Sequence, residues 1–451
     1  MFLLPTLLVC QEWIHNYTGY WFEKGNCLIE TDNHDILITG RVSTPDSGSQ
    51  IVLLNLDANG EENWVMEYGF YAADEGHDLL ITEDGLLIYG TGYYNSKHGL
   101  MLVKTNQSGV TSWIKGFPDF SQNIENSIVQ DNGGNIYLSA NLSLSDSPYL
   151  LKLNSQGETI WIKSYPDSTF DISNGQQLFL TEYGDILYTI KRMNNATEYT
   201  SEEVLKIDTA GTKLGSFQIP TNLTNFYNEK AFAVYDGHGI ITLAGIEDNN
   251  QEKRIVNVDM TDESIIWNKL IPFQYHTLED IIRTINGNYI LLTNDNSPSN
   301  LTDGLLLFDK NGEFIRQLSF EIENLFPKSI IQSSDGDLII TGYTDSEENQ
   351  YDIITFKIGM DKLTSNKSSF QNSNSIIVHP NPAKDYLFIK NENNFNVTIS
   401  LYSTSGHKLT SKQILALSNS KINLNDVAKG NYILQVCRDA MIIDIKKIIV
   451  L

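Results

Sequence analysis

The chain of 451 residues is long enough for a large repeat domain together with a smaller one, and its 22 Tyr, 19 Phe and 31 Gly favour β-structure over a helical bundle. Residues 371–451 hold nine Lys/Arg and five Asp/Glu, so residues 1–370 carry a formal charge of −29. So acidic a body argues against binding to nucleic acid or to an anionic membrane surface, because both require clustered Lys and Arg.

Residues 1–10 are an apolar stretch that is followed at once by polar sequence. The stretch is too short to span a bilayer, and no transmembrane segment is predicted. It is typical of the end of a secretory signal peptide whose basic first part is missing, as a start codon assigned too late would produce. We predict a signal peptide over residues 1–10, with Gln11 as the mature N-terminus. A lipoprotein signal with lipidated Cys10 is the alternative, although Val9 is bulky for its position.

One strand motif recurs about every 50 residues and organises residues 11–360. Each copy is a short run rich in Ile, Leu, Val and Tyr that is bounded by Gly, Asn or Asp, which is a strand signal and not a helix signal. The seven copies occupy residues 35–40, 85–90, 135–140, 185–190, 239–245, 288–293 and 337–342.

A second recurrence follows each of these runs. A third strand leads through a turn that ends in Gly to an aromatic residue, as residues 52–60 lead to Trp64. Asn-Gly and Asp-x-x-Gly turns supply the positive φ that a tight hairpin needs. Each copy therefore holds four short antiparallel strands, which cannot bury both faces of their sheet alone. Stacking the copies radially solves this problem and gives a β-propeller, with the recurring Trp packed between neighbouring blades.

The two ends of the array complement each other. The seventh copy lacks a fourth strand with its aromatic residue, whereas residues 12–19 match residues 63–69 without a preceding copy. The simplest account is that the strand of Trp13 completes the last blade and closes the ring, which removes two exposed sheet edges. We predict an all-β fold with a seven-bladed β-propeller over residues 11–360. A linear β-solenoid is the alternative, and the split repeat argues against it.

The C-terminal part of the chain has a different pattern. Residues 361–375 are rich in Ser and Asn and lack a period, so they are predicted to be a linker. From residue 376 the composition becomes basic, and short apolar runs predict a small all-β domain over residues 376–451.

Four segments of this domain resemble, in order, the type A sorting domain of the type IX (Por) secretion system. They are residues 379–390, 399–409, 422–436 and 446–450, and the residues that carry the motif are Pro380, Asn381, Pro382, Asp385, Gly406, Gly430, Tyr432, Lys446 and Lys447. Two departures are His379, where an aromatic is usual, and Cys437. The resemblance implies a small β-sandwich that the type IX export machinery of Bacteroidetes reads as an address. It also implies a secreted or cell-surface protein, with the domain removed or attached after export.

Motifs for catalysis and for cofactors are absent from the sequence. It contains no nucleophile elbow, His-Glu-x-x-His, phosphate loop or Gly-x-Gly-x-x-Gly, and its three Cys and eight His are scattered singly. Residues 57–60 and 309–312 are similar to the start of a calcium loop but lack the later ligands, so we interpret them as hairpin turns. The repeat loosely resembles uncharacterised propellers of secreted Bacteroidetes proteins and pyrroloquinoline-quinone-type repeats. Its Trp is a packing device, so no catalytic residue, metal or cofactor is predicted.

One set of loops carries the candidate binding residues. In a four-stranded blade, the loop that enters the first strand and the loop that leaves the second lie at the same edge. These loops are rich in aromatic and acidic residues, a combination that suits carbohydrate, because C–H groups stack on rings while hydroxyls bond to carboxylates. The alternative is that the rings fill gaps between blades. The exposed candidates are Trp21, Tyr71, Tyr93 and Tyr94.

These observations predict a secreted or cell-surface, non-catalytic binding protein whose ligand is a glycan or a protein. An extracellular propeller enzyme that acts on polysaccharide, such as a lyase or glycosidase, is one alternative, and it should bring carboxylates or His together at the channel mouth. A structural or adhesive surface protein is the other, and it should show neither feature.

Overall fold

The computed structural model describes residues 7–450 except residues 10–11, 20–21, 45–47, 70–72, 122–127, 143–144, 195–198, 221–230, 248–252, 272–276, 295–303, 321, 347–349, 361–375, 392–395, 404–407, 425–426 and 439–440. It divides into two compact units. One unit spans Leu8–Thr364, and the other comprises Ser365–Leu451 together with Met1–Leu7. The named elements of the described residues are all β-strands, and none of these residues forms a helix that could cross a membrane.

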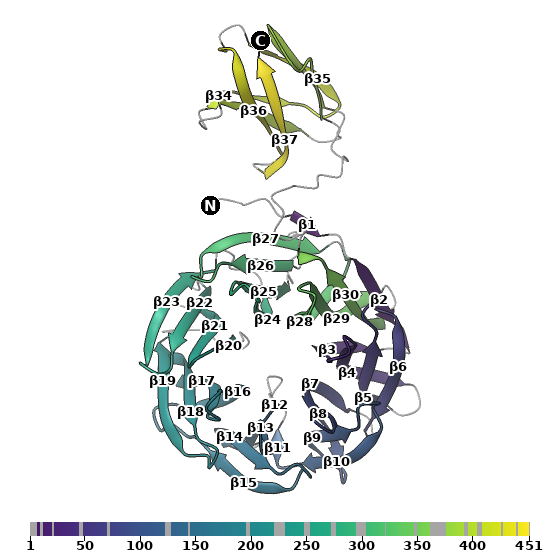
Figure 1. Cartoon of the computed structure of the whole chain (residues 1–451), viewed down its shortest axis with the longest axis vertical. Helices are drawn as coiled ribbons and strands as arrows, with labels where there is room; N and C mark the ends of the chain where they lie inside the picture. The colour runs from purple at the N-terminus through teal and green to yellow at the C-terminus, as the bar shows by residue number, and fades with distance from the viewer. Residues whose placement is uncertain are drawn as a thin grey trace. The chain divides into compact units, whose positions relative to one another are not determined.

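The larger unit is a ring of seven antiparallel sheets, each with its first strand innermost (Figure 1). The strands of the first three sheets, from the inner to the outer edge, are β3 (Lys24–Glu30), β4 (Ile36–Thr44), β5 (Gly48–Leu56) and β6 (Glu62–Tyr68); β7 (Glu75–Thr82), β8 (Gly85–Tyr94), β9 (Lys97–Thr105) and β10 (Thr111–Phe117); and β12 (Ile128–Gln130), β13 (Ile136–Leu142), β14 (Ser145–Leu153) and β15 (Thr159–Ser164).

The next three sheets repeat this meander. Their strands are β16 (Ile172–Leu180), β17 (Ile186–Asn194), β18 (Tyr199–Ile207) and β19 (Lys213–Pro220); β20 (Phe232–Gly237), β21 (Ile240–Glu247), β22 (Lys253–Asp259) and β23 (Ser264–Leu270); and β24 (Thr277–Arg283), β25 (Tyr289–Asn294), β26 (Gly304–Phe308) and β27 (Phe314–Phe320). Two short strands that the sequence did not predict are added to the third and sixth sheets. β11 (Phe120–Ser121) pairs with β13, and β1 (Leu7–Val9) pairs with β27.

The seventh sheet combines the two ends of the array. Its inner strands are β28 (Leu325–Gln332), β29 (Leu338–Ser346) and β30 (Gln350–Ile358), and its outer strand is β2 (Trp13–Tyr17). The pairing of β2 with β30 is antiparallel and puts Trp13 opposite Lys357. Ile339 and Ile353 of this sheet share one buried core with Leu28 of the first sheet. The N-terminal strand thus occupies the place that the split repeat predicts for it.

The recurring Trp locks neighbouring sheets together. It packs against the Gly of the turn before the outer strand in the next sheet, where a methyl group would lie 2.5 to 3.0 Å from the indole ring. These pairs are Trp13 with Gly60, Trp64 with Gly109, Trp113 with Gly157, Trp161 with Gly211, and Trp267 with Gly312. The Gly therefore has two reasons to lack a side chain, a positive φ and the ring above it. Trp13 makes this contact like the internal members of the series.

Several strands are longer than the sequence analysis predicts. The run at residues 85–90 was expected to end at Gly90, but β8 continues to Tyr94. Gly90 does not end the strand, because its missing side chain makes room for the carbonyl of Glu75 on the adjacent inner strand. Tyr93 and Tyr94 are consequently the last residues of a strand and not loop residues, which corrects their expected position.

The inner strands share an irregularity that places polar side chains around the centre of the ring. Five of the seven described inner strands shift register near their start, at Gly25/Cys27, Gly76/Asp78, Gly175/Leu178, Leu278/Asp280 and Pro327/Ser329. A bulge of this kind re-aims the side chain that it inserts. The inserted residues are polar, for example His77, Glu279 and Lys328.

The smaller unit is a β-sandwich. One sheet holds β31 (Ile376–His379), β32 (Tyr386–Asn391) and β35 (Ser418–Asn423), and the other holds β34 (Lys408–Ile414), β33 (Val397–Ser403), β36 (Gly430–Arg438) and β37 (Met441–Val450). Leu387 and Ile389 of the first sheet pack with Ile399 and Leu434 of the second in a single core. Alternating apolar residues on both sheets produce this core.

Candidate functional site

The four predicted aromatic candidates have different outcomes. Trp21 and Tyr71 lie outside the described residues. Tyr93 is 36% exposed and meets His98 edge to face at 5.1 Å between ring centroids. Tyr94 is half-buried and covers Gly116 of the outer strand, so it contributes to packing within its sheet. Of the two described candidates, Tyr93 is thus the better placed for contact with a ligand.

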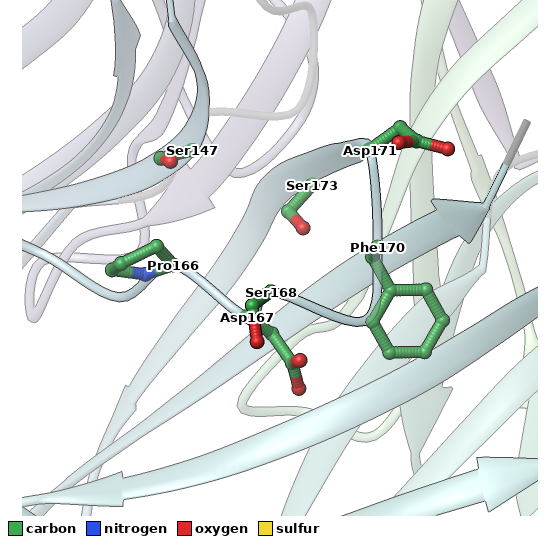
Figure 2. A pocket seen from close by; sticks show the side chains of 7 residues that line it. All are labelled: Ser147, Pro166, Asp167, Ser168, Phe170, Asp171 and Ser173. Carbon is green, nitrogen blue, oxygen red and sulfur yellow. The ribbon is translucent and has the colours of Figure 1, made fainter.

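A cavity of about 550 Å³ lies at the same edge of the sheets as Tyr93, between the third and fourth sheets. Its lining comes from the segment that connects β15 to β16, from Ser173 of β16 and from Ser147 of β14 (Figure 2). The lining residues are Ser147, Pro166, Asp167, Ser168, Phe170, Asp171 and Ser173. A volume of this size is typical of a pocket for a small ligand. We call it the Phe170 pocket.

The segment that lines the Phe170 pocket is held by its own hydrogen bonds. The N–H of Thr169 donates to Asp167 Oδ1 at 2.9 Å, and the N–H of Phe170 donates to the carbonyl of Asp167 at 3.1 Å. The N–H of Asp171 donates to the carbonyl of Met193 in β17 at 2.9 Å. An Asp that bonds to the backbone two residues further on is a common turn device. The segment therefore has a defined shape.

A buried ion pair between Arg192 and Glu203 holds the residues on both sides of the pocket. Arg192 and Glu203 bond to each other, and the side chain of each is 1% exposed. Arg192 also donates to Ser173 Oγ at 3.0 Å and, through both terminal nitrogens, to the carbonyl of Tyr165 at 3.2 Å. Lys213 adds a second cation 3.2 Å from Glu203. Because a buried charge without its partner is costly, this network fixes the backbone on both sides of the pocket.

The charge of Asp167 follows from its surroundings. Burial opposes ionisation, but hydrogen bonds from the backbone and side chain of Thr169, with the charges of Arg192 and Lys213, outweigh it and lower the pKa of Asp167. The carboxylate is therefore ionised at neutral pH and can accept hydrogen bonds. The pocket thus combines carboxylate and hydroxyl groups with the ring of Phe170.

The centre of the ring holds two carboxyl groups that could suggest catalysis. Asp78 of β7 and Asp280 of β24 are half-buried. Desolvation raises the pKa of Asp78 to about 6 and the pKa of Asp280 to about 7, and the charge of Asp78 contributes to the second shift. Carboxyl groups with raised pKa values are candidates for general acids. Their hydrogen bonds show whether they are available for catalysis or serve a structural role.

Both carboxylates serve as ties between neighbouring sheets. Asp78 accepts the N–H of Ile128 in the third sheet at 3.1 Å, and Asp280 accepts the N–H of Ile330 in the seventh sheet at 3.0 Å. The other oxygen of each accepts the N–H of the following residue at 2.8 Å. These bonds use both oxygens of each group for backbone donors. The geometry therefore favours a structural role, and it lends no support to a lyase or glycosidase.

In the two turns that are similar to calcium loops, the Asp carboxylate accepts hydrogen bonds from the backbone of its own turn. Asp57 Oδ1 accepts the N–H of Asn59 at 2.8 Å and the N–H of Glu61 at 2.9 Å, and Gly60 has a φ of +82°. Asp309 makes the same two bonds in its own turn. These are hairpin turns. Among the residues that the structure describes, no group of three or more His, Cys, Asp or Glu side chains is arranged to hold a metal ion.

In the sandwich, the predicted motif residues join its beginning to its end. The side chain of Asn381 donates to the carbonyl of Lys447 at 2.7 Å and accepts the N–H of Ile449 at 2.9 Å. Pro380 and Pro382 flank Asn381 and are exposed, and the carbonyl of Asp385 accepts the N–H of Leu424 at 2.9 Å.

The remaining motif residues lie in or beside the last two strands. Tyr432 is buried in β36 and donates to the carbonyl of Ala428 at 2.7 Å, and Gly430 begins that strand. Lys446 is half-buried and Lys447 is exposed on β37. Gly406 lies outside the described residues.

The two units define a β-propeller protein that carries a separate C-terminal sandwich. Residues 377–451 match the family model described as the secretion system C-terminal sorting domain. This part of the chain is a type IX sorting domain, which confirms the resemblance of its four segments. The domain indicates that the protein is secreted and then attached to the cell surface or released. It also implies contact with the type IX machinery.

Solved structures with propellers resemble the chain weakly. The Pan2 WD40 domain of Neurospora crassa is 10% identical with a TM-score of 0.47, covering 73% of this chain and 88% of its own. Drosophila Semaphorin 1a, extracellular domains 1–2, is 11% identical with a TM-score of 0.47, covering 78% and 90%. The β-propeller domain of the Trilobed protease from Pyrococcus furiosus is 10% identical with a TM-score of 0.45, covering 78% and 99%. No curated protein matches the chain.

The residues of the Phe170 pocket were not among the predicted site residues, although the sequence carries a signal for them. Residues 165–171 enter a first strand and contain two aromatic and two acidic residues, which is the combination sought in the other entering loops. The sequence gives no signal for the contribution of Arg192, because only the pairing of β16 with β17 brings its side chain to Ser173 Oγ.

Proposed function

We propose that this exported propeller is a carbohydrate-binding protein of the cell surface or extracellular space, and that the Phe170 pocket holds the sugar. The observation that carries the proposal is the lining of the pocket, which combines Asp167, Asp171 and three Ser residues with Phe170. Hydroxyl groups of a sugar donate to carboxylates and exchange hydrogen bonds with Ser, while C–H groups pack on rings.

The rigidity of the pocket supports the same function. Binding loses free energy when a loop must be ordered first, and the buried Arg192–Glu203 pair with the turn at Asp167 orders this segment beforehand. The position supports it as well. The pocket lies at the sheet edge that carries Tyr93 and Tyr94, so these two residues remain proposed contacts for a longer glycan. Trp21 and Tyr71 lie outside the described residues and remain proposed contacts on the basis of the sequence.

A glycan-array screen of the full chain, followed by titration of each sugar that binds, tests the proposal. Phe170→Ala and Asp167→Asn should each weaken binding about tenfold or more, because each removes a stacking surface or a charged acceptor worth ~1–2 kcal/mol. Tyr183→Ala is the matched control. Tyr183 is 79% exposed in the turn between β16 and β17, at the opposite edge of the same sheet.

Two results would count against the proposal. One is a folded chain that binds no glycan, and the other is sugar binding that Phe170→Ala and Asp167→Asn leave unchanged. If Tyr93→Ala alone abolished binding, the site would move to the second sheet. A pulldown that recovers a protein partner while the array stays silent would favour adhesion instead.

A further inference from the structure

A second cluster at the same edge of the ring surrounds a cation. Lys24 is the first residue of β3, and its Nζ lies 4.7 Å from the ring centroid of Tyr343 and 5.2 Å from that of Tyr351. Phe326 stacks on Tyr343 at 4.9 Å, and Phe22 meets Tyr351 at 5.2 Å. We call these five residues the Lys24 cage. Each of them is half-buried and keeps part of its surface accessible.

The two other cations beside the Lys24 cage are paired with carboxylates. Arg41 lies 3.8 Å from Glu75, and Lys328 lies 2.8 Å from Glu279. Lys24 makes no ion pair with a carboxylate among the residues that the structure describes. Burial, aided by the charges of Arg41 and Lys328, lowers the pKa of Lys24, although Glu75 opposes the shift. The cluster therefore holds an ammonium group without a direct ion pair among the described residues, and Glu75 acts on it only through its charge.

An ammonium group in this position is suited to a negative ligand. Aromatic faces stabilise a cation by ~1–2 kcal/mol, which is less than a partly desolvated charge needs. The rings of Tyr343 and Tyr351 hold Lys24 in place, and a carboxylate that reached Nζ would form a direct ion pair.

The charge of the whole propeller limits the kind of anion. Residues 1–370 carry −29, so they repel polyanions, and a single carboxylate on an otherwise neutral molecule is repelled least. Asn26 and Glu75 lie near the start of β3 and β7, where Asn26 Nδ2 donates to Glu75 Oε1 at 2.9 Å and to the carbonyl of Gly76 at 2.8 Å. The oxygens of these two side chains can accept further hydrogen bonds from hydroxyl groups, while Phe22 offers a ring for C–H groups. A carboxylate beside hydroxyls and C–H faces describes a uronic acid.

We propose that the Lys24 cage binds a terminal uronic acid residue of an otherwise neutral glycan, with its carboxylate on Lys24 Nζ. The site is separate from the Phe170 pocket. The cage is built by the first and seventh sheets, and the pocket by the third and fourth. The proposal therefore stands independently of whether that pocket binds a sugar.

Three probes of matched chemistry test the Lys24 cage on the full chain by calorimetric titration at low salt. Cellobiouronic acid carries one terminal carboxylate, cellobiose carries none, and polygalacturonate carries many. Cellobiouronic acid should bind at least tenfold more tightly than cellobiose, as a charge-assisted hydrogen bond predicts. Polygalacturonate should bind no more tightly per uronic acid residue. Equal binding of the two disaccharides, or no binding of cellobiouronic acid, would overturn the proposal.

Variants locate the effect. Lys24→Met keeps the length of the side chain and should remove the preference for cellobiouronic acid, whereas Lys24→Arg should retain most of it. Lys97→Met is the matched control, because Lys97 is exposed at the start of β9 at the same edge of the ring. If Lys24→Met still preferred cellobiouronic acid to cellobiose as strongly as wild type, the carboxylate would not bind at Lys24.

A measurement on the wild-type chain covers the case in which Lys24→Met does not fold. Limited acetylation with mass-spectrometric readout compares Lys24 with Lys97. Cellobiouronic acid should protect Lys24 several-fold and leave Lys97 unchanged, and cellobiose should protect neither. Equal acetylation of Lys24 with and without cellobiouronic acid would refute binding at the cage.

Discussion

At the residue scale, the molecule uses carboxylates in two opposite ways. Asp57 lies in a hairpin turn, where hydrogen bonds from the N–H groups of Glu61 and Asn59 outweigh desolvation and lower its pKa. Asp280 is half-buried between sheets, where desolvation raises its pKa to about 7. Both residues are Asp bonded to backbone N–H groups. The sign of the shift depends on whether desolvation or the hydrogen bonds to the carboxylate have the larger effect.

This difference predicts how stability depends on pH. Between the unfolded pKa near 4 and the folded pKa of about 7, the unfolded chain loses the proton of Asp280 while the folded chain keeps it, so rising pH destabilises the fold. Asp280→Asn removes this effect. The unfolding free energy of Asp280→Asn minus that of wild type should therefore rise from pH 5 to 7, by at most ~1.4 kcal/mol per pH unit and by less where water reaches the carboxyl.

Urea unfolding at several pH values checks this prediction, with Asp57→Asn as its control. The stability that a lowered pKa contributes is fully present above the unfolded pKa, so the difference between Asp57→Asn and wild type should stay flat from pH 5 to 8. If the Asp280→Asn difference were equally flat, the carboxyl of Asp280 would be ionised in the folded protein. The tie to Ile330 would then be stronger than desolvation.

At the element scale, the Trp-to-Gly lock explains how much of the fold is predictable. The 50-residue period, the Gly turns and the unpaired Trp13 strand are local patterns, so seven sheets and the position of β2 follow from them. Both Gly60 and Gly90 end a recurring segment in the sequence. Gly60 lies in a turn and packs against the ring of Trp13, whereas Gly90 lies inside β8. Only the neighbouring strand distinguishes them.

The binding regions were less predictable for the same reason. Loop composition indicated the edge of the ring at which the Phe170 pocket lies, but this pocket depends on Arg192, which lies more than 20 positions further along the chain and is buried against the segment. The Lys24 cage likewise combines residues from both ends of the array. Side chains that meet only through tertiary packing leave no periodic signal.

Gly60→Ala tests the lock at the junction between the first and last sheets. The substitution strains a backbone with φ of +82° and forces a methyl group to within 2.5 Å of the Trp13 ring. Gly184→Ala is matched in backbone, with φ of +86°, but has no atom within 4 Å of the added methyl group. Gly184→Ala should cost ~1–2 kcal/mol of stability, and Gly60→Ala roughly 2 kcal/mol more.

Denaturant unfolding measures both changes, and a second substitution identifies their cause. Trp13→Leu leaves room for the methyl group, so the added cost of Gly60→Ala should shrink in the double variant. Equal costs for Gly60→Ala and Gly184→Ala would show that Trp13 adapts without loss. The contact would then not lock the two sheets.

At the scale of the whole molecule, the chain divides its tasks between an acidic propeller and a basic sorting domain. The sorting domain is held together at its ends by Asn381, whose side chain bonds to the backbone of Lys447 and Ile449. The motif and the C-terminal strand are thus parts of one structural unit. A family motif that looks like four separate segments is in fact a set of contacts within one sandwich.

Asn381→Ala should reduce export. It removes two hydrogen bonds, and we expect the sandwich to lose ~1–3 kcal/mol of stability. Asn419→Ala, at an exposed position of β35, is the control and should be exported normally. Immunoblots of the extracellular and cell-associated fractions measure the outcome, and a chain that ends at residue 364 should remain inside the cell envelope. Normal export of that shortened chain would show that the address lies elsewhere.

The pairing of β2 with β30 also sets an order of events during biosynthesis. The partners of this pair lie more than 300 residues apart, so β2 waits for its partner until β30, the last propeller strand, has been synthesised. Until then β2 lacks the partner strand that it has in the finished sheet. The junction between the first and last sheets therefore stays open until residues 350–358 have been made, and we expect the ring to close after its other six sheets have been synthesised.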